Sequence, residues 1–118
     1  MLIMVKLKVC VDFDGVLNNY KEYDETDLGE PRLNVQEFIK ELQKEYEVII
    51  LTARNTQRVK KWLKHNNLPD LTVTNQKIPA AAYIDDRAIR FNGDYDAVLC
   101  ELKDFKPYWD KTEDVIYD

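Results

Sequence analysis

The sequence VCVDFDGVL, residues 9–17, places an apolar run directly before two carboxylates and a glycine. Apolar runs of this kind are typical of strands that are buried on both faces of a parallel sheet. Asp12 and Asp14 share a face in a regular strand, so their like charges raise the pKa of one of them unless a cation lies between them. Mg2+ takes oxygen ligands and commonly binds one or two carboxylates together with water and a phosphate. The stretch therefore favours a magnesium site, although Asp and Gly also favour an ordinary solvated turn.

Length and composition indicate one globular domain over residues 1–118. The 22 acidic and 17 basic residues give a net charge of −5, which argues against a general nucleic-acid or membrane-surface binder. A small anionic substrate is still compatible with this charge. Cys10 and Cys100 are too few for a disulfide framework, which fits a cytoplasmic protein. The apolar start, residues 1–5, is too short for a signal peptide or a membrane span. The oligomeric state stays open.

Strands and helices are expected to alternate along the chain. The expected strands are apolar or β-branched runs: 7–13, 47–52, 71–74 and 83–86. The expected helices carry apolar side chains at helical spacing: 35–44, 56–66 and 95–102. Residues 97–100 also fit a fifth strand.

The segments outside these elements are polar or irregular. Residues 18–30 form an expected loop, and Asn34 is expected to cap the first helix. Trp62 and Tyr83 are expected in the core. The tail from residue 106 shows no periodicity, and its apolar side chains are expected to cover the core: Tyr108, Trp109, Val115 and Ile116.

This alternation predicts a three-layer α/β/α Rossmann-like parallel sheet, in which ligands bind beyond the carboxyl ends of the strands. Several polar side chains are expected at those strand ends or in the loop before the last strand: Asp12, Asp14, Thr52, Lys77, Asp85 and Asp86. Right-handed crossovers bring them to the same edge of the sheet. The sequence therefore predicts one site that combines carboxylates, a hydroxyl and an ammonium group.

In this order the residues resemble the four motifs of the haloacid dehalogenase superfamily, which is dominated by phosphatases. The motifs are DFDGV at 12–16, IILT at 49–52, Lys77, and IDD at 84–86. Val16 stands where many members of the family have threonine, which is an accepted variant. The resemblance covers about the first three quarters of the chain. The intervals between the first three motifs hold little beyond one helix each, so no inserted cap domain fits.

The resemblance implies an Mg2+-dependent phosphatase that works through an aspartyl phosphate. Asp12 is then the nucleophile and Asp14 the general acid and base. Thr52 donates to a phosphoryl oxygen, and Lys77 offsets charge in the transition state. The implied Mg2+ ligands are the carboxylate of Asp12, the backbone carbonyl of Asp14, and the pair Asp85 and Asp86, with Asp86 favoured as a direct ligand. The implied substrate contacts are Gly15, Ala53 and Arg54.

The sequence leaves alternatives open for both the substrate and the functional class of the protein. The substrate is expected to be a small phosphorylated sugar or nucleotide or a nucleic-acid end, in an open site that residues 18–30 or another subunit closes. Tyr20 or Tyr23 could contact it, Arg54 could instead form a surface ion pair, and His65 is given no catalytic role. Response-regulator receiver domains also combine acids, a threonine and a lysine, but there the adjacent acidic pair comes first and the lysine last. A non-catalytic binding module on the same scaffold is the third possibility.

Overall fold

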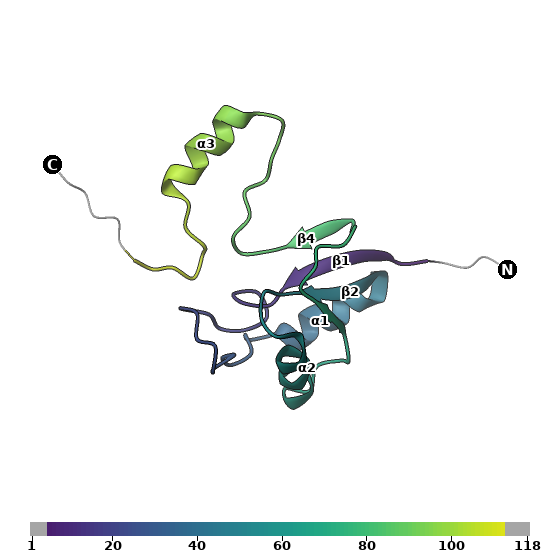
Figure 1. Cartoon of the computed structure of the whole chain (residues 1–118). Helices are drawn as coiled ribbons and strands as arrows, with labels where there is room; N and C mark the ends of the chain where they lie inside the picture. Colours follow the sequence, from purple (N-terminus) through teal and green to yellow (C-terminus); the bar gives the residue numbers. More distant parts are fainter. Residues whose placement is uncertain (1–4, 113–118) are drawn as a thin grey trace.

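Four parallel strands form one sheet in the order β3-β2-β1-β4 (Figure 1). The structure is a computed structural model and describes residues 5–112. The strands are β1 (Leu7–Asp12), β2 (Tyr46–Leu51), β3 (Thr72–Thr74) and β4 (Ala82–Ile84). The helices are α1 (Val35–Glu45), α2 (Thr56–His65) and α3 (Tyr95–Asp104). This arrangement confirms the predicted α/β fold class with a Rossmann-like parallel sheet.

The strand order reverses at β1, which lies between β2 and β4. The chain passes from β1 to β2 to β3 in one direction and then returns to place β4 on the other side of β1. β4 pairs with β1 from Val9↔Ala82 to Val11↔Ile84. In parallel sheets such a reversal leaves a crevice between the carboxyl ends of the two strands that flank it, here β1 and β4, and ligands bind there. The residues that follow β1 and β4 therefore border that crevice.

The hydrophobic core lies between one face of the sheet and the helices α1 and α2. Alternate residues of β1 and β2 face this side, and both helices bury their apolar stripes in the same cluster. Ile39 of α1 and Val59 of α2 are completely buried. Burying such a side chain contributes roughly 1.5–3 kcal/mol, so this packing supplies much of the driving force that fixes the sheet.

The opposite face of the sheet also buries side chains, but these lie outside the core cluster formed with α1 and α2. Cys10 and Ile49 alternate with the core residues and are 1% and 3% exposed. Beside Cys10 in the sheet lies Tyr83, whose hydroxyl donates a hydrogen bond to the carbonyl of Ile78 in the connection between β3 and β4. Tyr83 is 40% exposed, so the expectation that it lies in the core is wrong. The reason is that β4 is an edge strand of the sheet.

Residues 95–104 form helix α3, so the alternative strand over 97–100 is wrong. The helix begins locally: the side chain of Asp94 accepts a hydrogen bond from the backbone N–H of Ala97 at 3.2 Å. Its apolar residues Tyr95, Leu99 and Leu102 are 77%, 60% and 57% exposed. Figure 1 shows α3 standing apart from the sheet and from the other two helices.

Of the predictions for single residues next to or within the helices, the one for Trp62 is confirmed and the one for Asn34 differs in its geometry. Trp62 is 8% exposed and lies in the core as expected. Asn34 precedes α1, but its φ of 68° places it in the left-handed region and its side chain makes no capping hydrogen bond. Capping geometry requires extended backbone at that position, which explains the difference. None of the helices among the described residues is long and apolar enough to cross a membrane.

The tail also differs from its predicted role. Tyr108 and Trp109 lie outside the core cluster and contact the loop after β1 and the turn after β4 instead. The cause is the position of α3, which carries the chain away from the core before the tail returns to the carboxyl edge of the sheet. Val115 and Ile116, also expected to cover the core, lie outside the described residues.

Candidate functional site

Three carboxylates converge at the crevice between β1 and β4. One oxygen from each of Asp12, Asp85 and Asp86 lies within 4.8 Å of the other two. Asp12 is the last residue of β1, and the two other acids directly follow β4. Because Val11 pairs with Ile84, the parallel ladder places the next residues of both strands side by side. Backbone pairing therefore brings these charges together from distant parts of the sequence.

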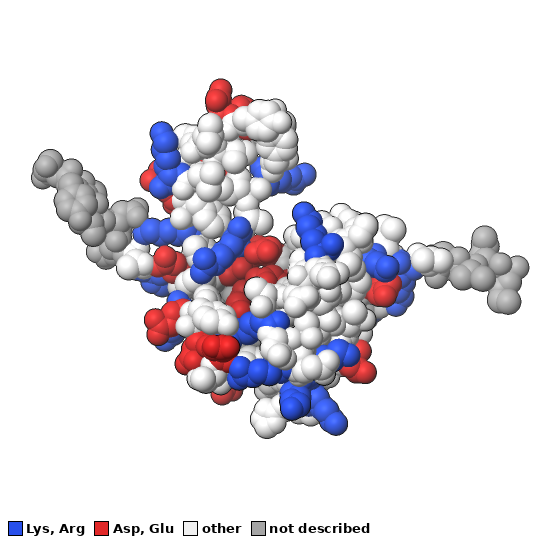
Figure 2. Space-filling view, viewed as in Figure 1, with Lys and Arg blue, Asp and Glu red and all other residues white. Residues whose placement is uncertain are grey.

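This convergence has an electrostatic cost that Asp12 shows directly. Burial, its hydrogen bond with Asp86 and the charges of Asp85 and Asp86 raise the pKa of Asp12 to about 8. Figure 2 shows acidic atoms gathered in the middle of the molecular face, where the part of the chain that carries α3 meets the sheet. Neighbouring oxygens around an octahedral Mg2+ are about 3 Å apart and opposite ones about 4 Å, so three carboxylate oxygens that all lie within 4.8 Å of one another can reach one ion after small side-chain movements. The three carboxylates therefore fit a hard divalent cation.

Asp14 belongs to a second group of contacts. Its carboxylate accepts a hydrogen bond from Nε of Arg54 at 2.8 Å and another from Nδ2 of Asn18 at 2.9 Å. The Asp14 and Arg54 side chains are 23% and 4% exposed, so this is a largely buried ion pair. Arg54 therefore forms an ion pair, as considered from the sequence, but a largely buried one and not one at the surface. The side chain of Asp14 is not among the clustered oxygens, and its backbone carbonyl as a ligand stays a prediction.

Thr52 and Arg54 connect the end of β2 to the loop after β1. The hydroxyl of Thr52 accepts a hydrogen bond from the backbone N–H of Arg54 at 3.0 Å, and both residues are buried. The guanidinium of Arg54 also donates to the carbonyl of Asp24 at 2.7 Å and lies 4.8 Å from the ring centroid of Tyr23. Ala53, which lies between Thr52 and Arg54 in the sequence, is exposed. Arg54 thus holds both Asp14 and the loop in place.

Gly15 lies between the acidic cluster and the contacts of Asp14. Its φ of 83° is in the left-handed region, and its N–H donates to Oδ1 of Asn18 at 2.8 Å. A Cβ at this position would collide with the Asp86 carboxylate and would lie 2.8 Å from the indole nitrogen of Trp109. Backbone conformation and space therefore both require glycine here.

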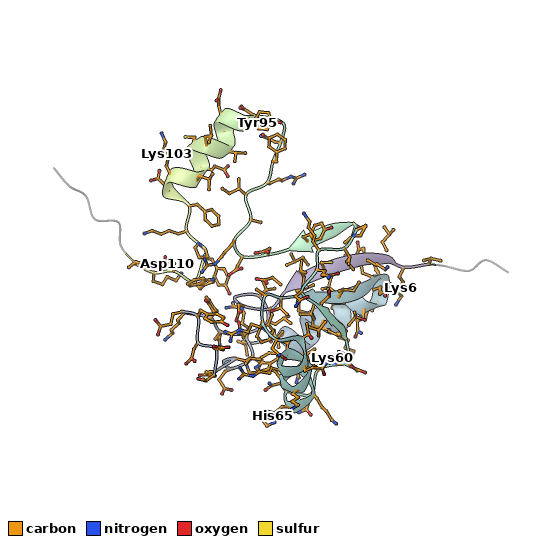
Figure 3. The ribbon with its side chains drawn as sticks, in the orientation of Figure 1. Lys6, Lys60, His65, Tyr95, Lys103 and Asp110 are labelled. Atoms are coloured by element: carbon orange, nitrogen blue, oxygen red, sulfur yellow. The ribbon has the colours of Figure 1, made fainter. Side chains whose placement is uncertain are left out.

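Lys77 lies on the connection before β4. It is exposed, and its ammonium is 4.7 Å from the ring centroid of Tyr83. Among the described residues it forms no ion pair with Asp12. The structure therefore does not bring Lys77 into contact with the acidic cluster. His65, which was given no catalytic role, lies at the far end of α2 (Figure 3).

Three residues of the site were not predicted from the sequence. Asn18 bridges Gly15, Asp14 and the carbonyl of Leu28, the last at 2.6 Å. The hydroxyl of Tyr108 donates to the carbonyl of Gly15, and the indole N–H of Trp109 donates to Asp86. Asn18 sits in a polar loop, where nothing in the sequence separates it from its neighbours. The two tail aromatics carried only a hydrophobic signal.

A groove of ≈ 510 Å³ borders the acidic cluster. Its lining includes Gly15, Asp85, Asp86, Arg32 and Tyr108. A larger cavity of ≈ 660 Å³ lies along α2 and the segment that follows it, among lysines and Asp70. That cavity contains none of the clustered carboxylates, so the groove is the candidate substrate site.

No protein-family model and no curated protein matches the sequence. The chain is similar in structure to a solved protein described as a conserved protein coded by a locus from Bacteroides thetaiotaomicron. The TM-score is 0.59 and the sequence identity 21%, over 93% of this chain and 100% of the other. At this identity the likeness establishes the fold alone.

Replacing Gly15 by alanine should disrupt the acidic cluster, and Gly93→Ala provides a matched control. Both glycines have positive φ values, 83° and 95°, but a Cβ at Gly93 meets nothing within 4 Å. We expect Gly93→Ala to lower the free energy of unfolding by about 1–2 kcal/mol. Gly15→Ala should lower the free energy of unfolding by more than this, as measured by urea denaturation. Equal losses would show that the contact with Asp86 and Trp109 does not constrain this position.

The metal-free protein should become less stable as the pH rises toward 8. The pKa of Asp12 is about 8 in the folded chain, above its ordinary value of 3.8, so between these values the folded state binds more protons than the unfolded state. The free energy of unfolding therefore falls across this range and levels off above pH 8. Thermal unfolding in EDTA from pH 5 to 8 should show a steeper decline for the unmodified protein than for Asp12→Asn. Parallel curves would contradict the raised pKa.

Proposed function

We propose that this protein is an Mg2+-dependent phosphatase of the haloacid dehalogenase type that hydrolyses a phosphomonoester through an aspartyl phosphate. The observation that carries the proposal is the convergence of Asp12 with Asp85 and Asp86 at the reversal of strand order. Asp14 lies two residues further on, held in a separate ion pair with Arg54 at 2.8 Å. A nucleophile, a metal-binding acidic pair and an independently held acid are the parts that such a reaction needs.

The residues that would hold Mg2+ are Asp12, the acidic pair after β4 and the backbone carbonyl of Asp14. All are hard oxygen donors, and the three carboxylates are close enough to share one ion. When bound, the cation supplies the positive charge that keeps Asp12 ionised and shields its attack on a phosphate that is also anionic.

The reaction itself uses two aspartates in sequence. The ionised carboxylate of Asp12 attacks phosphorus and forms a P–O bond while the bond to the leaving oxygen breaks. Asp14 acts in its protonated form, which requires that it first leaves the ion pair with Arg54. It then gives its proton to that oxygen, and an alcohol departs. Asp14 then takes a proton from a water molecule that attacks the aspartyl phosphate, which releases inorganic phosphate and restores Asp12.

Thr52 and Lys77 are assigned to the phosphoryl oxygens. Because the Thr52 hydroxyl accepts a hydrogen bond from the Arg54 backbone, its own proton is free to be donated to a phosphoryl oxygen. The contact of Lys77 with the Tyr83 ring is exposed and worth about 0.5–1 kcal/mol, which an anionic substrate can replace. Gly15, Ala53 and Arg54 border the same edge and are the proposed substrate contacts.

The proposed site is open, which bears on substrate size. Between β1 and β2 the chain contains only the loop 13–34 and α1, and between β2 and β3 only α2 and short connections. The groove beside the acidic cluster admits a small phosphorylated sugar or nucleotide. A nucleic-acid end is the other candidate, although the net charge of −5 disfavours a long polyanion.

Phosphatase activity should depend on Mg2+ and on Asp12. We expect the protein to release p-nitrophenol from p-nitrophenyl phosphate with Mg2+ and not with EDTA. Asp12→Asn should lower turnover by at least about three orders of magnitude because the nucleophile is lost. Asp70→Asn is the matched control: Asp70 is 94% exposed and precedes β3, at the opposite edge of the sheet.

Two outcomes of this assay contradict the phosphatase. Unchanged turnover in Asp12→Asn would rule out the nucleophile. A stable phosphoprotein formed by the unmodified chain from a small phosphoryl donor, without turnover, would favour a receiver-like signalling domain.

A further inference from the structure

The C-terminal tail returns to the acidic cluster after α3. In Figure 3, Tyr95 and Lys103 mark α3 well away from the sheet, while Asp110 lies back toward the carboxyl end of β1. The tail is attached there by two side chains. The hydroxyl of Tyr108 donates to the backbone carbonyl of Gly15, and the indole N–H of Trp109 donates to Oδ2 of Asp86.

Trp109 is fixed by contacts with two separate segments, the loop after β1 and the turn after β4. Besides its hydrogen bond to Asp86, its ring packs edge-to-face on Tyr20 with centroids 4.7 Å apart. The guanidinium of Arg87 lies 4.9 Å from the centroid of the same ring. The indole nitrogen also lies where a Cβ on Gly15 would be in contact with it. The indole is therefore held in one orientation, with its only donor directed at a carboxylate of the cluster.

A hydrogen bond of this kind can orient a metal ligand without occupying it. A carboxylate has two oxygens and about four lone-pair positions, so Asp86 can accept the indole N–H and still offer an oxygen to a cation. An indole is neutral, so it leaves the negative charge of the cluster uncompensated. Carboxylates that bind metals are commonly held by such outer contacts, and removing one typically costs about 10–100-fold in metal affinity.

We propose that Trp109 is a positioning residue of the metal site, which couples the placement of the tail segment 106–112 to metal binding. This inference rests on the proposed function. By linkage, if the attached tail strengthens metal binding, the bound metal must stabilise the attached tail by the same free energy.

The first test measures the metal affinity of the full chain without substrate. Mn2+ prefers the same oxygen ligands as Mg2+, and its free concentration can be followed by electron paramagnetic resonance. We expect Trp109→Phe, which keeps an aromatic ring but loses the N–H, to raise the Kd for Mn2+ about 10–100-fold. Tyr108→Phe is the matched control, because it removes a donor from the same tail that does not reach a carboxylate. Tyr108→Phe also loosens the tail, so its Kd should rise, but clearly less than in Trp109→Phe, because the hydrogen bond to Asp86 remains.

The second test measures the reciprocal effect on the tail. Lys111 is exposed, and trypsin cleavage after it, identified by mass spectrometry, reports release of the tail. Mg2+ should slow this cleavage in the unmodified protein but not in Trp109→Phe. Thermal unfolding in EDTA establishes that the variant is folded.

The possible failures are distinguishable. An unchanged or lower Kd in Trp109→Phe, equal losses in both variants, or cleavage that Mg2+ does not slow would overturn the role of Trp109 and leave the phosphatase intact. If the unmodified protein bound neither Mn2+ nor Mg2+, the metal site would be refuted, and this inference with it.

Discussion

Repulsion among Asp12, Asp85 and Asp86 is the constraint on which the site depends. Two ionised carboxylates less than 5 Å apart repel by about 3–4 kcal/mol at an effective dielectric constant near 20, with less for the exposed Asp85. Summed over three pairs, this repulsion falls within the 5–15 kcal/mol that stabilises a whole domain. The cluster therefore needs a proton or a cation. In the metal-free chain a proton serves: burial, the hydrogen bond with Asp86 and the two neighbouring charges together raise the pKa of Asp12 to about 8.

The fold makes this arrangement unavoidable. β1 is held from one side by β2 and from the other by β4, and the apolar stripes of α1 and α2 lock that face of the sheet. Once Val11 pairs with Ile84, the acids that follow both strands must lie side by side. Hydrophobic burial on one side of the sheet thus supports an unfavourable concentration of charge at its carboxyl edge. The ion pair of Asp14 with Arg54 keeps a further carboxylate out of that concentration.

Local patterns predicted the elements well, and the convergence of the acids followed from topology. The apolar run into Asp12 and the acids after Ile84 are strong signals, because parallel strands share a carboxyl edge. Sequence patterns did not predict where α3 and the tail lie relative to the sheet. Tyr95 and Leu99 have the spacing of a buried stripe, yet both are exposed on α3, and Trp109 was expected to cover the core. Which surface an apolar side chain covers is decided by nonlocal packing, which periodicity does not encode. The present position of Lys77 depends likewise on the path of a connection without regular structure.

Whether the three carboxylates share one cation beside a phosphoryl group on Asp12 can be seen in a crystal structure with Mg2+ and beryllium fluoride, because BeF3⁻ binds a carboxylate as a phosphoryl group does. We expect beryllium bonded to an oxygen of Asp12 and Mg2+ ligated by Asp12 and by the acids after β4. Mg2+ bound elsewhere, or an Asp12 carboxylate that takes up neither group while Mg2+ and BeF3⁻ are both present, would contradict this expectation.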